Sequence, residues 1–308
     1  SLPVSVTSGY TQQVVNGGAV RSQGIEIIVM GKLIKKKDFE WSTTLNFSRN
    51  IATVQSLPQR DGRLTLGYSG IYDNTNQRVW FQVEEGGRVG DMYGTGYKTT
   101  ADGTLLIDEN GGLIADNELR KLGNYNPDFI LGIGNRFNYK RWDANVLLDW
   151  RQGGILVSRT QALAGVGGQL EETKFRPESG FVITGVVNTG TEANPVYEQN
   201  TTAVSAETFY RQYYDRNHEE NNTFNASYLK VREVAIGYSF PTNKNTGFWK
   251  GVESMKISLV GRNLFAFSEI PHFDPEQVAV QGQQFVSGVE DMSYATSRSI
   301  GIKLGVNF

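Results

Sequence analysis

The sequence predicts an all-β protein that crosses a membrane as an antiparallel β-barrel. Apolar and polar residues alternate along segments of about ten residues, the length that a tilted strand needs to cross a bilayer. The connections between these segments alternate between short turns and long polar stretches. No stretch approaches the roughly 18 consecutive apolar residues of a membrane helix, which excludes helical spans.

The last segment, Ser297–Phe308, carries this alternation to the end of the sequence. Small or polar residues separate its apolar residues, which are Ile300, Ile302, Leu304, Val306 and Phe308. Successive side chains of a strand point to opposite faces, so one face of this strand is suited to lipid and the other to water.

Six segments upstream repeat the pattern, and we predict strands at 21–34, 39–54, 128–139, 142–151, 226–240 and 254–265 in addition to 297–308. In the fourth strand, Trp142 and Trp150 end an apolar face, as in the aromatic girdles of barrels. In the fifth, the phase of the alternation changes near Arg232 and Glu233. This change predicts a β-bulge or a strand that leaves the membrane there.

The connections are short at 35–38, 140–141 and 241–251, and long at 55–127, 152–225 and 266–296. In an antiparallel meander all the long connections lie at one end, and outer-membrane barrels place long loops outside the cell and short turns in the periplasm. We predict a short helix near Ser158–Ala164. Seven strands leave two open edges, which lipid does not tolerate, so we expect further strands elsewhere.

Composition excludes several other classes of protein. The 30 basic and 32 acidic residues are mixed along the chain, so no basic stripe for nucleic acid is present. The absence of cysteine excludes disulfides and thiolate sites. A mean hydropathy of -0.37 is compatible with a barrel, whose strands offer only every second residue to lipid. The chain begins at Ser1 without a leader segment, so we expect an N-terminal part outside this sequence.

The sequence contains no recognisable catalytic arrangement. The only histidines, His218 and His272, have no partner at ligand spacing. No nucleophile elbow or phosphate-binding loop is present, so no enzyme is predicted. The acidic pairs Glu171-Glu172 and Glu219-Glu220 are interpreted as solvated loop residues. Loop aromatic residues are candidates for stacking on sugar rings, with mutual packing of the loops as the favoured alternative: Trp80, Tyr93, Tyr210 and Tyr213.

Several motifs occur together in one order along the chain. They are Asn16-Gly17-Gly18 with Arg21–Glu26, Gly123–Asp128, Ser227–Arg232 with Gly237–Pro241, Gly261–Phe265 and Asp274–Glu276, followed by the closing Phe308. Jointly they resemble SusC/RagA-type TonB-dependent outer-membrane transporters, and the resemblance spans the whole chain.

The resemblance implies that the chain is the last seven or so strands of a barrel of about 22 strands, with the plug domain outside this sequence. It implies a multi-pass protein in the outer membrane of a Gram-negative bacterium of the Bacteroidetes type. The implied function is active import of oligosaccharides or peptides, with a SusD-like surface lipoprotein and energy from TonB through the missing N-terminal part. A structural or docking barrel, or a secretion-associated pore, is the alternative.

Two further expectations concern single sites. The family's calcium-type loop resembles residues 108–116, where Asp108, Asn110 and Asp116 are the candidate ligands. This loop is one residue shorter and lacks the third ligand, so an Asx/Gly turn is the favoured alternative and no other cofactor is expected. Phe308 ends an apolar row and is the candidate signal for the barrel assembly machinery, with a simple interfacial anchor as the alternative.

Overall fold

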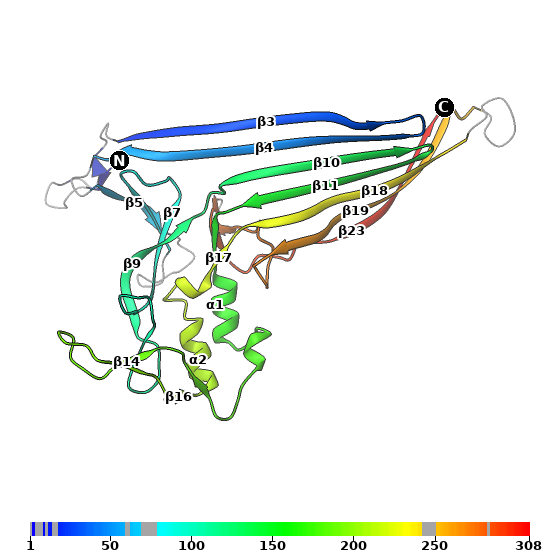
Figure 1. Ribbon diagram of the computed structural model, residues 1–308. Helices are drawn as coiled ribbons and strands as arrows, with labels where there is room; N and C mark the ends of the chain where they lie inside the picture. The colour runs from blue at the N-terminus through cyan, green and yellow to red at the C-terminus, as the bar shows by residue number, and fades with distance from the viewer. Residues whose placement is uncertain are drawn as a thin grey trace.

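A seven-stranded antiparallel sheet dominates the computed structural model, which describes residues 2–3, 9, 12–13, 18–58, 62–68, 79–241, 251–281 and 284–308 (Figure 1). The strand order is β23-β19-β18-β11-β10-β4-β3, so each strand pairs with the next sheet strand along the chain. The strands are β3 Ala19–Lys35, β4 Phe39–Ser56, β10 Phe129–Tyr139, β11 Trp142–Gln152, β18 Tyr228–Phe240, β19 Ser254–Ser268 and β23 Ser299–Asn307.

These strands occupy the seven stretches in which the sequence alternates. β3 and β19 extend beyond the predicted bounds, whereas β23 ends one residue before Phe308. Asn16 and Gly17 of the first motif, and residues 242–250 of the third short turn, lie outside the described residues. The outer edges of β3 and β23 have no partner strand within the described part of the chain.

One face of the sheet carries aromatic residues in two rows, one near each end of its strands. Tyr139, Trp142 and Tyr238 are direct cross-strand neighbours at the end with short turns. Trp150 lies eight residues from Trp142, a distance of about 26 Å at about 3.3 Å per residue. Because barrel strands are tilted by about 35–45°, this length corresponds to roughly 20 Å across the membrane, which is most of the apolar band of about 25 Å in outer-membrane barrels. This face has the dimensions of a lipid-facing wall.

The predicted phase change in the fifth strand is a β-bulge. The register between β18 and β19 shifts between Val231 and Glu233. On the other side of β18, Val231 pairs with Leu148 and Val234 pairs with Val146. Because Val146 and Leu148 share the apolar face, the bulge places Val231 and Val234 on that face despite their odd spacing.

The three long connections fold into a separate body at the end of the sheet opposite the short turns (Figure 1). Its larger sheet contains β5 Arg63–Tyr68, β6 Trp80–Glu84, β7 Asp91–Tyr97 and β9 Ala115–Asn124. Its helices are α1 Arg159–Val166, α2 Ala206–Tyr213, and the 3-10 turns η2 Glu172–Lys174 and η3 Glu220–Asn222.

Shorter strands complete the body of long connections: β8 Leu106–Ile107, β12 Ile155–Ser158, β13 Phe181–Val182, β14 Val186–Asn188, β15 Tyr197–Gln199, β16 Ala203–Val204, β17 Thr223–Asn225, β20 Ala279–Gln281, β21 Gln284–Val286 and β22 Val289–Glu290. Near the N-terminus, β1 Leu2–Pro3 pairs with β2 Gln12–Gln13. No helix in the described ranges is long and apolar enough to span a membrane.

The first long connection was expected to lack sustained alternation, yet it holds four strands of a sheet. β7 explains the difference, because nearly all its residues are buried on both faces and such strands show no period of two. α1 lies at the helix predicted near Ser158–Ala164, and the Ser158 hydroxyl caps it by accepting the N–H of Gln161 at 3.0 Å. α2 was not predicted.

A shared apolar core joins the three connections. Val79 and Met92 come from the first connection, Val157 from the second, and Ala279 and Val289 from the third; each is at most 1% exposed. The body of long connections is therefore one packed unit rather than three independent loops.

Candidate functional site

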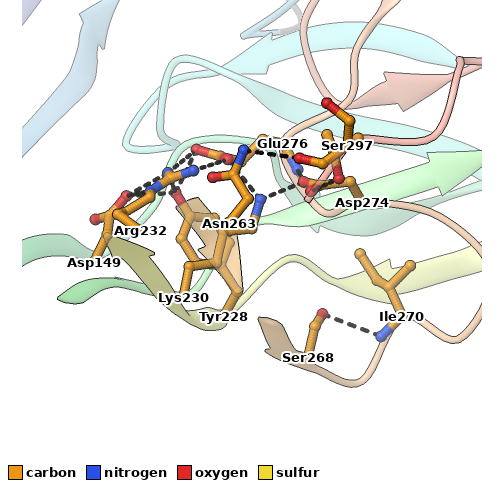
Figure 2. A network of polar contacts seen from close by, with 11 residues as sticks. Asp149, Tyr228, Lys230, Arg232, Asn263, Ser268, Ile270, Asp274, Glu276 and Ser297 are labelled. Carbon is orange, nitrogen blue, oxygen red and sulfur yellow. Dashed lines mark hydrogen bonds and ion pairs between the residues drawn. The ribbon is translucent and has the colours of Figure 1, made fainter. Parts of the chain in front are cut away.

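A network of charged side chains joins the third long connection to the sheet (Figure 2). It lies on the face opposite the apolar one, which we call the inner face. β18 supplies Lys230 and Arg232, and β11 supplies Asp149. Asp274 and Glu276 come from the connection between β19 and β23. We refer to Asp149, Tyr228, Lys230, Arg232, Asp274 and Glu276 together as the wall clamp.

Lys230 is the most buried charge of the wall clamp, with a side chain 5% exposed. Its ammonium Nζ lies 2.5 Å from Glu276 Oε2 and also forms an ion pair with Asp274. A buried ammonium is costly unless acidic partners surround it, so this residue requires the third connection to be in place.

Arg232 extends the wall clamp across two strands. Its Nε donates to Asp149 Oδ2 at 3.0 Å and its Nη1 donates to Glu276 Oε2 at 2.6 Å. The Tyr228 hydroxyl donates to Glu276 Oε1 at 2.9 Å. Burial opposes ionisation of Glu276, but the hydrogen bonds from Arg232 and Lys230 outweigh it and lower the pKa of Glu276 to about 2.

Asp274 ties the two ends of the third connection together. One carboxylate oxygen accepts the N–H of Glu276 at 2.9 Å, and the other accepts the hydroxyl of Thr296 at 2.8 Å. Asn263 of β19 also donates to the carbonyl of Ser297 at 3.3 Å. The sequence showed the two motifs that hold these residues, Ser227–Arg232 and Asp274–Glu276, but not their contact across more than 40 residues.

A second attachment holds the same connection to α1. Glu290 is fully buried, and its two carboxylate oxygens accept the hydroxyls of Ser158 and Thr160 at 2.6 Å each. Ser158 is also the N-cap of α1. The third connection is therefore fixed both to the sheet and to the second connection.

A pocket of about 360 Å³ opens between the first and third connections. Its walls are polar and apolar in nearly equal parts, and the apolar residues include Phe81, Val83, Val286 and two residues exposed at 60% and 76%, Leu66 and Phe285. This volume lies within the range of small-ligand sites. The sequence indicated no such pocket, because its walls come from segments about 200 residues apart.

The structure separates the four aromatic candidates by burial. Tyr93 and Tyr210 are only 6% and 8% exposed, which corresponds to the packing alternative. The Tyr210 hydroxyl donates to the carbonyl of Phe175 at 2.7 Å, and burial raises the pKa of Tyr93 to about 12. Trp80 is partly buried and pairs with Tyr93, whereas Tyr213 is 38% exposed on α2. A sugar-stacking role stays a prediction.

The candidate calcium ligands Asp108, Asn110 and Asp116 make other contacts in the structure. Asp108 Oδ1 accepts the N–H groups of Asn110 and Gly112 at 2.8 Å each, which is the geometry of an Asx turn. Asp116 forms an ion pair with Arg120 on β9. Among the described residues, no three acidic or histidine side chains are placed to hold a metal ion. Calcium binding at Asp108, Asn110 and Asp116 stays an untested prediction.

The interpretation of Glu219 as a solvated loop residue is wrong. Glu219 is 2% exposed, because η3 packs its side chain against β7. Its neighbour Glu220 and the earlier pair Glu171-Glu172 keep side chains that are 45% or more exposed. His218 is also buried, at 6% exposed.

Phe308 is 85% exposed beyond the end of β23, and its role in assembly stays a prediction.

Comparisons with known proteins agree with the motifs. The chain is 24% identical over 293 residues to TonB-dependent receptor P3 of Formosa agariphila, a match that covers 89% of this chain and 27% of the receptor. It is 20% identical over 316 residues to the TonB-dependent receptor SusC of Bacteroides thetaiotaomicron, covering all of this chain and 28% of SusC. The chain thus spans about a quarter to a third of the curated relatives it matches.

Solved structures show the same fold. The RagAB peptide importer in its open-open state matches all of this chain and 31% of its own with a TM-score of 0.63 at 16% identity. The RagAB peptide transporter matches 98% of this chain and 31% of its own with a TM-score of 0.61. No protein-family model matches the chain. The expected transmembrane β-barrel fold is confirmed, and the chain forms one segment of such a barrel.

Proposed function

We propose that this chain, which is similar in sequence and fold to SusC/RagA-type TonB-dependent receptors, forms part of the wall and mouth of an outer-membrane importer of oligosaccharides or peptides. The observation that carries the proposal is the wall clamp. It holds the third long connection against the inner face of the sheet (Figure 2). In a complete outer-membrane barrel, the body of long connections would then lie at the extracellular entrance.

The proposal includes partners and location. A SusD-like surface lipoprotein would contact the body of long connections, and TonB would supply energy through the plug domain outside this sequence. The whole protein would be a multi-pass protein of the outer membrane of a Gram-negative bacterium. The similarity of the chain to proteins named TonB-dependent receptors supports these points. None of those names is that of an enzyme, and we propose no catalytic role.

Uptake by cells tests the proposal. A strain lacking the full-length gene is complemented with the wild type, with Leu66→Arg at the rim of the pocket, or with Leu119→Arg. Leu119 is 46% exposed and does not line the pocket, so it is a matched control. We expect wild type and Leu119→Arg to restore uptake of a labelled oligosaccharide or peptide, and Leu66→Arg to restore several-fold less.

Energy dependence separates importer from pore. Import through TonB stops when the proton-motive force is dissipated. Uptake that continues without it, or outward leakage of periplasmic proteins, would instead support the secretion-associated pore. Normal uptake of every oligosaccharide and peptide in the deletion strain would support a structural or docking barrel.

A further inference from the structure

Glu219 lies where the second long connection packs against β7 of the first. Its carboxyl group is buried, and the backbone N–H of Thr95 donates to Oε2 at 2.9 Å. The other oxygen, Oε1, is also buried and has no hydrogen-bond partner in the described part of the chain. A buried acceptor without a donor is costly when it carries charge.

The Thr95 hydroxyl gives Glu219 little further support. It lies 3.4 Å from Glu219 Oε2 but 2.6 Å from the carbonyl oxygen of Asn217. A hydroxyl group has a single proton, and the closer carbonyl accepts it. An ionised Glu219 would therefore leave Oε1 buried without a donor, and protonation removes the charge from this unpartnered position.

Two glycines of β7 leave room for the carboxyl groups of Glu219 and Glu220. A Cβ atom added at Gly94 would lie 2.8 Å from Glu219 Oε2, and one at Gly96 would overlap the carboxylate of Glu220. The sequence Gly94-Thr95-Gly96 thus allows η3 to approach β7 closely while Thr95 supplies the hydrogen bond. The close contact between η3 and β7 therefore depends on the small residues at these two positions of β7.

The charges around Glu219 do not neutralise it. Its own segment carries Asp215, His218 and Glu220, and burial lowers the pKa of His218, so this histidine is neutral near pH 7. Facing groups on the neighbouring strands are Tyr97 of β7 and the residues Asp116 and Arg120 of β9. Arg120 forms ion pairs with Asp116 and Glu220. Glu219 forms no ion pair among the described residues.

We propose that Glu219 is a proton-dependent latch, which holds the second long connection against β7 when its carboxyl group is protonated and loosens that contact when the group ionises. Desolvation by burial raises the pKa of Glu219 from 4.5 to about 7. The folded junction therefore binds a proton more tightly than the open one. Its stability is complete below pH 4.5 and is lost as the pH rises to about 7. This inference does not depend on what the protein transports.

Hydrogen exchange of the full-length protein in detergent tests the latch. Protection of the amides of Thr95 and Asn222, corrected for the intrinsic pH dependence of exchange, reports opening of the contact between β7 and η3. We expect protection in the wild type to fall by up to about tenfold for each pH unit between about 5 and 7. Glu219→Gln, which is neutral at every pH, should show constant protection.

Glu220→Gln is the matched control, because it removes the neighbouring but exposed carboxylate and should keep the wild-type pH dependence. A wild type without pH dependence, or Glu219→Gln with the same dependence as wild type, would overturn the proposal. If Glu219→Gln does not fold, infrared spectroscopy of the wild type decides. A buried protonated carboxyl band must be present near pH 5 and absent near pH 8.

Discussion

Arg232 shows what one residue contributes to this fold. It occupies the extra position of the β-bulge in β18, because the consecutive residues Leu148 and Leu147 of β11 pair with Val231 and Glu233. The bulge keeps the apolar residues on both sides of it on the lipid face. At the same point Arg232 reaches inward to Asp149 and Glu276, so the irregularity in the strand coincides with the attachment of the third connection.

The first prediction at this scale concerns substitutions on the two faces of β11. Val146 lies midway between the two aromatic rows on the apolar face, whereas Asn145 pairs with Arg136 on the inner face. We expect Val146→Arg to destabilise the full-length protein by about 2 to 4 kcal/mol, because it places a charge in hydrocarbon. Asn145→Arg should cost much less. Urea unfolding of refolded protein measures both, and equal losses would show that the faces are assigned wrongly.

The second prediction concerns the ion pairs of the wall clamp. Asp274→Asn removes an acidic partner from Lys230, whose side chain is 5% exposed. We expect a loss of about 1.5 to 3 kcal/mol, because the buried ammonium of Lys230 loses one of its two carboxylate partners and keeps only Glu276. Glu233→Gln breaks the more exposed pair with Arg262 and should cost less than about 1 kcal/mol. Thermal unfolding and limited proteolysis of the third connection compare the two; similar effects would argue against the clamp.

The pKa of Glu276 adds a pH dependence to the clamp. Because this pKa is lowered from 4.5 to about 2, the contribution of Glu276 to stability is present above pH 4.5 and is lost as the pH falls towards 2. We expect protease resistance of the third connection to be constant from neutral pH to about pH 5 and to fall only in stronger acid. Loss of resistance between pH 7 and pH 5 would contradict this assignment.

At the scale of the element, the residue that follows β23 is expected to affect assembly of the barrel but not the stability of the folded protein. Phe308 follows this strand and is 85% exposed, so its deletion removes few contacts within the chain. We expect deletion of Phe308 to lower the amount of protein in the outer membrane sharply, while protein refolded in detergent keeps nearly its full stability. Phe240→Ala, at the same end of β18, is the control and should accumulate normally. Normal levels of the deletion variant would show that Phe308 is only an anchor.

At the scale of the whole molecule, the alternation of short and long connections defines two sides. Thr191 lies in the second long connection and Lys36 in the short turn between β3 and β4, and both are exposed. We expect a cysteine at Thr191 to react with a membrane-impermeant maleimide on intact cells. A cysteine at Lys36 should react only after the outer membrane is opened, and the reverse pattern would invert the topology.

The sequence was sufficient to predict the sheet, because each of its strands has one face in lipid and one in water. That difference imposes a period of two on the residues and even reveals the bulge at Arg232. The same argument explains why β7 of the first long connection was missed. β7 is buried on both faces, so no alternation marks it.

Only the folded chain shows which distant residues meet. The motifs that contain Lys230 and Asp274 were visible separately, but their ion pair depends on how the third connection turns back to the sheet. Glu219 appeared to be one of two equivalent acids, and packing against Gly94 makes it a buried one. Burial and long-range contact follow from the tertiary arrangement, and no local pattern of residues encodes them.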